Sequence, residues 1–363
     1  MRRRHGKVNR WVLVSLACVA VGGFWLEARS ARRQRAPGYD VKLASSRLAA
    51  RAFDIVRQYR DSLGVPVDTV NDPNASGLIG VQYSQLTYGR SDLSDALTTL
   101  NPNFAAVLLE MLVRAGVRPG DTVGVSWDGT YPALNIALLA VAACYPFEPL
   151  LVTAQTAGMW GANYPGLTWL DIEALLRHHG LWQYRTAFAT LGGEADDGRG
   201  LSPAGREAMA ATAAAAGVDL FVPGSLEEAV RRRVAAFGRP RAFVSVGRVA
   251  ADMGDPGARI PSRVIARPTP RVSSGVIAAM LDAGVPVVYL ANPGRVAVDY
   301  RLPVAPVPVP EPGDGALFHE RRRSVILALV FAAIILALLV VVVRYDVEWY
   351  LGVGRHRPDE EAV

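Results

Sequence analysis

Residues 121–144 read DTVGVSWDGTYPALNIALLAVAAC, and this stretch decides the fold class. The first seven residues alternate in the way of a buried strand, and a short polar turn follows them. Pro132 stands where the first turn of a helix favours proline, and the apolar run behind it continues to Cys144. The stretch therefore predicts a strand, a tight turn and a helix that packs back on the strand.

The same alternation of strand and helix extends over most of the chain. The predicted helices are 41–63, 104–115, 133–144, 169–179, 203–216, 226 onward and 272–283, and the predicted strands are 77–84, 121–127, 149–153, 219–222, 241–246 and 285–290. Such alternation is typical of a largely parallel sheet with helices on both faces. We therefore predict a Rossmann-like α/β domain over residues 36–302.

Two apolar runs flank this domain, and both predict transmembrane helices. Residues 11–28 read WVLVSLACVAVGGFWLEA, and residues 324–343 read SVILALVFAAIILALLVVVV. A helix of about 20 apolar residues matches the thickness of a bilayer core. For the first run, a cleaved signal peptide and a lipoprotein modified at Cys18 are alternatives that the sequence leaves open.

The charges support a membrane protein and argue against a nucleic-acid-binding one. The chain has a net charge of +6, but twelve cations lie in its two ends, at Arg2, Arg3, Arg4, Lys7, Arg10, Arg29, Arg32, Arg33, Arg35, Arg321, Arg322 and Arg323. The rest of the chain is therefore net acidic, whereas a nucleic-acid protein needs basic residues on its folded surface. The dense cluster in the basic N-terminus, residues 1–10, favours termini inside the cell and an extracytoplasmic domain.

Two further segments complete the predicted organisation. Residues 303–318 contain five prolines at alternating spacing, which predicts a stiff extended spacer between the domain and the second apolar run. Residues 344–363 form a C-terminal tail. The two cysteines, Cys18 and Cys144, are too few for a disulfide framework or a zinc site, and we predict no metal and no cofactor.

The turn after the strand 121–127 is the first candidate for a ligand site. Ligands of open parallel sheets bind where strands end and loops lead into helices, and a helix N-terminus favours anions. The candidate ligand-binding residues here are Ser126, Asp128, Gly129, Thr130 and Asn135. An ordinary capped turn without a ligand is the alternative.

Ser126 does not fit the pattern of a hydrolase nucleophile. The nucleophile elbow requires glycine two residues after the serine, where this chain has Asp128. The only histidines within the domain are the adjacent pair His178 and His179, which a helix directs about 100° apart. We therefore predict no catalytic residue.

Two more clusters follow predicted strands. Trp160, Asn163 and Asp171 would suit a ligand with amide or carboxylate groups if their loop lies beside the 126–132 turn. Packing of that loop by tryptophans is an equal alternative. Arg248, after the strand 241–246, is placed to pair with a carboxylate, although most such arginines are simply solvated. The chain contains no GxxxxGK[ST], HExxH or CxxC motif.

Several segments resemble the poly-gamma-glutamate system protein family, whose members are membrane proteins associated with the synthesis of poly-γ-glutamate. The resemblance rests on SDLSDALTTLNPNFAAVLLEMLVRAGVRPGDTVGVSWDGTYPALNIALLAVAA (91–143), on WGANYPGLTWLDIE (160–173) and on the run from GVPVVYLANP to LPVAPVPVPEPG (284–313). In the family pattern small residues precede the Pro-Ala-Leu-Asn of the turn, where this chain has Trp127 and Asp128. The resemblance implies a pathway and no particular reaction.

Together these features predict a bacterial, two-pass membrane accessory protein of a γ-glutamyl polymer synthesis or export system. Its expected partners are the membrane, the polymer synthase components, and glutamate or the anionic polymer. One alternative is a hydrolase or transferase that acts on the γ-glutamyl polymer, with Ser126 or Asp128 in the leading role. Another is a nucleotide-binding regulator, which would require a cytoplasmic domain.

Overall fold

The computed structural model describes residues 10–29, 32–255, 257–269, 272–322 and 325–344. It divides into two compact units, one formed by Ala36–Phe318 and one by the chain on either side of it. Apart from Arg10 and Arg344, the predicted basic N-terminus and C-terminal tail lie outside the described residues.

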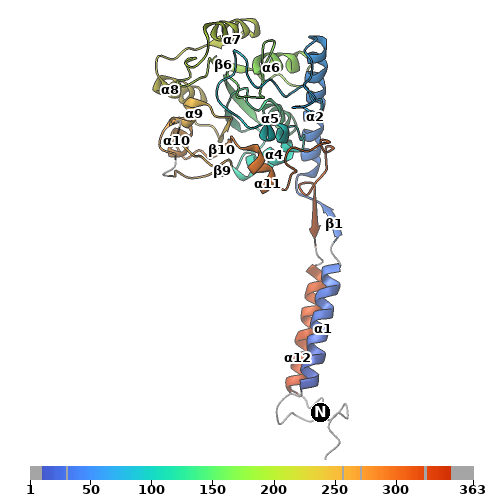
Figure 1. Cartoon of the computed structure of the whole chain (residues 1–363). Helices are drawn as coiled ribbons and strands as arrows, with labels where there is room; N and C mark the ends of the chain where they lie inside the picture. The colour runs from blue at the N-terminus through green and yellow to red at the C-terminus, as the bar shows by residue number, and fades with distance from the viewer. Residues whose placement is uncertain (1–9, 30–31, 256, 270–271, 323–324, 345–363) are drawn as a thin grey trace, which may run out of the picture. The chain divides into compact units, whose positions relative to one another are not determined.

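The larger unit is built on a seven-stranded sheet with the order β7-β6-β3-β2-β8-β10-β9 (Figure 1). Its strands are β2 (Thr122–Trp127), β3 (Glu148–Ala154), β6 (Thr186–Thr190), β7 (Asp219–Leu220), β8 (Ala242–Val246), β9 (Val264–Ile265) and β10 (Val287–Leu290). All neighbouring strands run parallel except β9, which pairs antiparallel with β10. The predicted α/β fold with a largely parallel sheet is therefore confirmed.

Helices cover both faces of the sheet because its strands are apolar on both sides. In β8, Val244 and Val246 belong to one hydrophobic core, whereas Phe243, which directly precedes Val244, belongs to a second. Helices α2, α4 and α5 contribute to the first core, and α10 contributes to the second. The helices of this unit are α2 (Tyr39–Ser62), α3 (Leu93–Thr99), α4 (Phe104–Arg114), α5 (Pro132–Cys144), α6 (Trp169–His178), α7 (Pro203–Ala216), α8 (Leu226–Phe237), α9 (Ala250–Met253), α10 (Gly275–Asp282) and α11 (Pro293–Asp299).

Residues 77–84, predicted as a strand, form an irregular segment instead. Their backbone groups pair with loops rather than with a strand: the N–H of Gly80 donates to the carbonyl of Trp160, 3.0 Å away, and the N–H of Val81 donates to the Asn163 side chain, 3.0 Å away. The buried guanidinium of Arg60 donates to the carbonyls of Gly77 and Ile79. Tertiary contacts thus override the local strand pattern.

The proline-rich segment 303–318 lies against the folded unit instead of forming a free spacer. The buried Asn103 amide donates to the Glu311 carbonyl at 2.9 Å and accepts from the Gly313 N–H at 2.9 Å. Asn74 holds the segment in the same way, by donating to the Pro306 carbonyl at 2.9 Å and accepting from the Val309 N–H at 3.2 Å. Proline leaves these backbone groups without strand partners, and side chains of the domain supply them instead.

We expect Asn103→Ala to lower the free energy of unfolding by about 2 kcal/mol, because it removes two part-buried hydrogen bonds, one to the Glu311 carbonyl and one from the Gly313 N–H. Urea unfolding of the full-length protein in detergent measures this change, and proteolysis within 303–318 should become faster. The matched control is Asn71→Ala, which removes only an exposed hydrogen bond to Asp68. Equal effects of the two substitutions would contradict this account of the segment.

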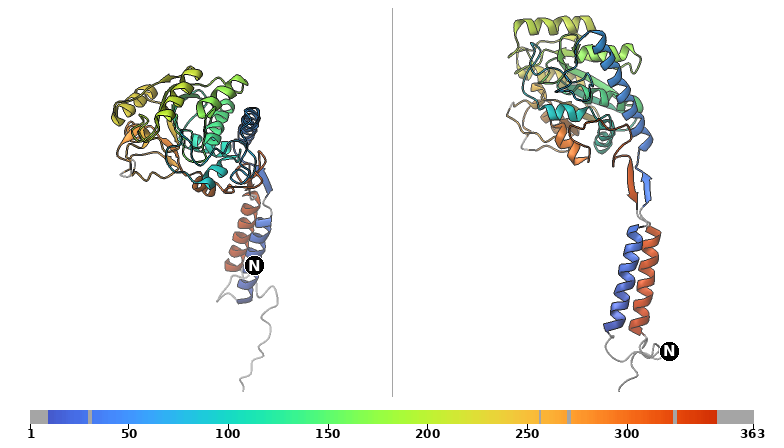
Figure 2. Two further views of the ribbon diagram at one scale, coloured as in Figure 1. Left: turned by 45° about the horizontal axis from the view of Figure 1, so that its top comes forward. Right: turned by 45° about the vertical axis from the view of Figure 1, so that its right-hand side comes forward.

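The smaller unit contains two helices and a two-stranded ladder. Helices α1 (Arg10–Arg29) and α12 (Val325–Arg344) lie side by side (Figure 2), close enough that a Cβ on Gly23 would stand 2.7 Å from the Phe331 ring. Strands β1 (Arg32–Arg35) and β11 (His319–Arg322) pair antiparallel, with Arg32 opposite Arg322 and Arg33 opposite Arg321.

Helices thus occupy both regions for which the sequence predicts transmembrane segments. Over the described residues, no single helix combines the length and the apolar character that crossing a bilayer requires. Only α3 and α4 taken together, with a bend of 86° between them, reach that length and composition.

The short antiparallel pair β4 (Asn163–Tyr164) and β5 (Leu167–Thr168) completes the described strands of the larger unit. It forms a tight hairpin in the loop between β3 and α6. This hairpin leads directly into α6, whose first residue is Trp169.

Candidate functional site

A cavity of the larger unit lies at the carboxyl edge of the sheet, where the strand order reverses. From β2 the chain moves outward through β3, β6 and β7, and it then returns to the other side of β2 with β8. Open α/β sheets bind ligands at this kind of switch point, because the two loops diverge there and leave a crevice.

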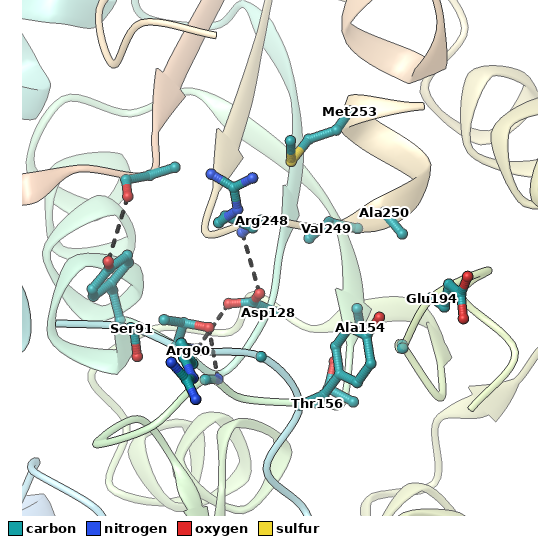
Figure 3. Close-up of a pocket in the computed structure, with 18 of the residues that line it drawn as sticks. Arg90, Ser91, Asp128, Ala154, Thr156, Glu194, Arg248, Val249, Ala250 and Met253 are labelled. Atoms are coloured by element: carbon teal, nitrogen blue, oxygen red, sulfur yellow. Dashed lines mark hydrogen bonds between the residues drawn. The ribbon is translucent and has the colours of Figure 1, made fainter. Parts of the chain in front are cut away.

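The cavity measures about 360 Å³, which suits a small molecule or the end of a larger one. Its walls come from the segments that follow β2, β3, β6, β8 and β10, and from residues 88–95 at the start of α3 (Figure 3). The polar and charged residues that line it are Tyr88, Arg90, Ser91, Asp92, Asp95, Asp128, Thr130, Tyr131, Thr156, Glu194, Asp196 and Arg248.

Asp128 is held at the centre of this edge by backbone N–H groups on both sides. Its Oδ1 accepts from the Thr130 N–H at 2.8 Å, and its Oδ2 accepts from the Arg248 N–H at 3.3 Å. The carboxylate therefore bridges the turn after β2 and the turn after β8. Gly247 makes this possible, since a Cβ there would lie 2.3 Å from Oδ1 of Asp128.

Burial raises the pKa of Asp128 to about 6, although the hydrogen bonds from Thr130 and Arg248 and the Arg248 charge favour the ionised form. Burial also raises the pKa of the half-buried Asp95 and that of Tyr131. The cavity wall thus combines a carboxyl group that titrates near neutral pH with a phenol that stays protonated.

Three of the predicted site residues line this cavity: Asp128, Thr130 and Arg248. The Thr130 hydroxyl accepts from the Gly158 N–H at 2.9 Å and so ties the turn after β2 to the loop after β3. Arg248 exposes its side chain on the other side of Asp128.

Two predicted residues stabilise the turn after β2 from outside the cavity lining. The buried amide of Asn135 donates to the Asp128 carbonyl at 2.9 Å, so the first turns of α5 fix the backbone at Asp128. The Gly129 N–H donates to the Thr156 carbonyl at 2.9 Å, and its own carbonyl accepts from the Ala162 N–H at 2.7 Å. Neither residue belongs to the cavity lining, but both shape it.

Ser126 lies within β2 and is fully buried away from the cavity. It stands opposite Ser245 in the register of β2 and β8, so the two hydroxyls share one face of the sheet. Neither a histidine nor a cysteine lies among the described residues that line the cavity. This placement gives Ser126 no access to a ligand in the cavity.

The cluster of Trp160, Asn163 and Asp171 lies near the turn, as the sequence predicts, but its side chains serve the fold. Asn163 donates to the Val81 carbonyl at 2.7 Å, and Asp171 accepts from Thr168 in a capping box at the start of α6. Trp160, in a left-handed conformation, packs against the larger hydrophobic core. None of the three lines the cavity.

Gly161 sets the distance between the loop 160–163 and the turn 128–131. A Cβ on Gly161 would lie 2.5 Å from the Gly129 carbonyl oxygen and 2.8 Å from Cα of Thr130, and both of these are backbone atoms. The loop 160–163 and the turn 128–131 can therefore approach this closely only with glycine at 161.

We expect Gly161→Ala to destabilise the protein by about 3 kcal/mol, because the added methyl group must displace backbone rather than a flexible side chain. Thermal unfolding of the full-length protein measures the effect. Gly224→Ala is the matched control, since its Cβ would meet only the end of a flexible side chain, the Oε2 atom of Glu228. An equally mild effect at both positions would disprove the tight approach of the loops.

Sequence reasoning missed two parts of the cavity. Residues 88–95 follow no strand and reach the carboxyl edge only through the tertiary fold, and Gly192, Gly193 and Glu194 follow β6, which was not predicted. A usable signal did exist in the first case: Asp92 stands directly before α3 as an N-cap, with its side chain accepting from the Ser94 N–H at 2.7 Å.

A buried ionic network lies behind the cavity wall at Asp196. The Asp196 carboxylate contacts the guanidinium of Arg233 and accepts from the Thr190 hydroxyl at 2.8 Å. Arg233 also donates to Thr190 at 3.0 Å, and its side chain is fully buried. The network fixes Asp196 in a left-handed conformation, with φ of 66°, and so fixes the loop that carries Gly192 and Glu194.

Asp252 of α9 adds a second buried carboxyl group to this region. It accepts from the Ser245 hydroxyl at 2.7 Å, and it is completely inaccessible to solvent. Burial raises the pKa of Asp252 to about 6, against the opposing influence of the Arg233 charge and nearby hydroxyl groups. Arg233 thus contacts one buried carboxyl group, that of Asp196, and its charge also acts on a second, that of Asp252.

Among the described residues, no group of three or more His, Cys, Asp or Glu side chains is arranged to hold a metal ion. Comparison with protein-family models, with curated proteins and with solved structures finds no match to this chain.

Proposed function

We propose that this protein is a binding component of a poly-γ-glutamate synthesis or export system, and that its cavity takes a small carboxylate-bearing ligand of that system. The observation that carries the proposal is the cavity at the switch point of the sheet, with the exposed guanidinium groups of Arg90 and Arg248 on its wall. Guanidinium groups match carboxylates in geometry and charge, and the volume suits glutamate or one end of a γ-glutamyl chain.

The sequence resemblance in segments 91–143, 160–173 and 284–313 supports the assignment to this system. These segments include the turn at Asp128 and the part of the proline-rich segment 303–318 that Asn103 binds. The apolar runs 11–28 and 324–343, each flanked by arginines, support attachment to a membrane by both ends. Under this proposal the larger unit lies outside the cytoplasm, where it meets the polymer or the synthase.

A second candidate is a hydrolase or transferase that acts on the γ-glutamyl polymer. Asp128 favours it, because a carboxyl group with a pKa near 6 in a cavity has the properties of a general acid or base. Ser126 does not favour it, since the cavity does not reach that side chain. If this candidate is correct, Asp128→Ala should reduce turnover by orders of magnitude, while Ser126→Ala leaves it unchanged.

Calorimetric titration of the full-length protein in detergent tests the proposed function. Glutamate and a short γ-linked glutamyl oligomer should bind, and the double substitution Arg90→Gln/Arg248→Gln should weaken binding at least tenfold. Arg231→Gln, on the exposed side of α8, is the matched control. Absence of binding by every γ-glutamyl compound would refute the proposal, and release of glutamate from the oligomer would favour the enzyme.

Protease treatment of intact and broken cells tests the membrane arrangement separately. Cleavage of the larger unit from outside supports a role at the cell surface and excludes a nucleotide-driven regulator. Cleavage only after lysis would overturn the proposed orientation without bearing on ligand binding.

A further inference from the structure

The charges of the cavity are not those of a site for a purely anionic ligand. Five carboxyl groups line it, those of Asp92, Asp95, Asp128, Glu194 and Asp196, against only two guanidinium groups. A ligand that brought only negative charge would meet a net acidic wall, which disfavours its binding.

Not all of these carboxyl groups are available to a ligand. Asp196 is neutralised by Arg233 from behind the wall. Asp92 caps α3, and its side chain, like that of Glu194, is exposed to solvent. Two groups remain, the buried Asp128 and the half-buried Asp95.

Neither Asp128 nor Asp95 forms an ion pair within the part of the chain that the structure describes, although the charge of Arg248 favours the ionised form of Asp128. Both oxygens of Asp128 accept from backbone N–H groups, and one oxygen of Asp95 accepts from the Gly294 N–H at 2.8 Å, but neither carboxyl group forms an ion pair there. Asp128 exposes only 7% of its surface. Buried carboxylates in proteins are normally paired with a cation, because desolvation of the lone charge is costly.

We propose that the ligand itself supplies the missing cation, so that the cavity recognises an ammonium group beside a carboxylate, with Asp128 facing the ammonium. This inference rests on the proposed function and narrows its ligand. In a γ-linked glutamyl chain every unit keeps its α-carboxylate, but only the amino-terminal unit keeps a free α-ammonium group. The cavity therefore takes free glutamate or the amino-terminal unit of the chain, and not the chain interior.

The arrangement of the side chains fits both charges of such a ligand. In the view of Figure 3, Asp128 lies between the labelled side chains of Arg248 and Arg90. An ammonium group at Asp128 leaves the adjacent carboxylate to one of these arginines.

The first test compares ligands on the unaltered full-length protein. Glutamate should bind at least tenfold more tightly than N-acetylglutamate or glutarate, which keep the carboxylates and lack the ammonium group. Acetylation of the amino terminus should weaken binding of a γ-glutamyl dipeptide by a similar factor. Both enantiomers of glutamate are titrated, since the inference concerns charge and not configuration.

The second test uses Asp128→Asn, which keeps the side-chain shape and removes the negative charge. Affinity for glutamate should fall at least tenfold, and affinity for glutarate should not fall. Asp197→Asn is the matched control, because that carboxylate lies in the same region, pairs with Arg199 and does not line the cavity. Thermal unfolding of each variant shows whether it is folded.

The outcomes separate this inference from the function on which it rests. If the acetylated and free compounds bind equally well, the ammonium inference is overturned while the proposed function stands. If no γ-glutamyl compound binds, both fail. The inference is supported if Asp128→Asn binds glutamate no more tightly than glutarate while Asp197→Asn still binds glutamate more tightly. This holds even where the absolute affinities are modest.

Discussion

Replacing Arg233 by leucine should lower the free energy of unfolding by about 3–5 kcal/mol. The substitution removes the cation that contacts Asp196 and donates to Thr190, and it leaves the Asp196 carboxylate buried without an opposite charge. It also removes the positive charge that favours ionisation of Asp252. Urea unfolding of the full-length protein at neutral pH measures the loss.

A second substitution at Asp196 distinguishes the ionic effect from simple loss of packing. In Arg233→Leu/Asp196→Asn the buried charge is absent, so part of the lost stability should return. Arg231→Leu, an exposed arginine two residues earlier on α8, is the matched control and should change stability by less than about 0.5 kcal/mol. If the double variant is no more stable than Arg233→Leu, the ion pair does not explain the effect.

The fold could be predicted because its main elements have strong apolar patterns. The helix from Pro132 and the strands around Val125 and Val244 appear where the sequence places them. Strand β6, at 186–190, was missed because its five residues TAFAT are short and partly small or polar. The prediction of a strand over residues 77–84 is wrong because Gly80 and Val81 form hydrogen bonds with loop residues about 80 positions away. A local sequence pattern does not show such distant contacts.

The candidate site could be predicted only in part, for a similar reason. The rule that ligands bind at the carboxyl ends of parallel strands identifies Asp128, Thr130 and Arg248, because each lies in the turn after a strand. The same rule cannot find Arg90 or Asp95, which reach the cavity from a segment outside the sheet. The rule also cannot distinguish a ligand-binding residue from Asn163, whose side-chain amide forms two hydrogen bonds with the Val81 backbone.

The pairing of Arg233 with Asp196 was equally hidden in the sequence. The two residues lie 37 positions apart, on a loop and on the buried face of α8. An arginine within LEEAVRRRVAAF looks like one of several on a solvated helix face. Only the packing of α8 separates Arg233 from its neighbours Arg231 and Arg232.

The second large effect on stability is expected at Asp252. The direction of its pH dependence follows from the pKa of the Asp252 side chain. Its ordinary pKa is 3.8, and burial raises the value to about 6 in the folded protein. Between these two values the folded state holds a proton that the unfolded state has released, so stability falls as the pH rises through this window. The stability is fully present below about pH 4 and lost above about pH 6, and the difference amounts to about 3 kcal/mol.

Asp252→Asn should therefore make the protein more stable at pH 7 by up to about 3 kcal/mol and leave its stability unchanged at pH 4. The asparagine cannot ionise, its carbonyl oxygen still accepts from the Ser245 hydroxyl, and Arg233 keeps its contact with Asp196. Urea unfolding of the variant and the parent at several pH values gives the difference directly. Subtracting the two curves removes the contribution of Asp128, which titrates in the same window in both proteins.

The opposite behaviour is expected of Asp197→Asn, which serves as the control for the sign. There the hydrogen bonds and charge of Arg199 outweigh burial and lower the pKa of Asp197, so its ionised form supports folding at neutral pH. Loss of that carboxylate should reduce stability at pH 7 and have no effect well below its pKa. If Asp252→Asn were also destabilising at pH 7, the buried carboxylate of Asp252 would have to be a required partner of Arg233. Arg233 would then stabilise two charged aspartates, Asp196 and Asp252, and not one charged and one readily protonated group.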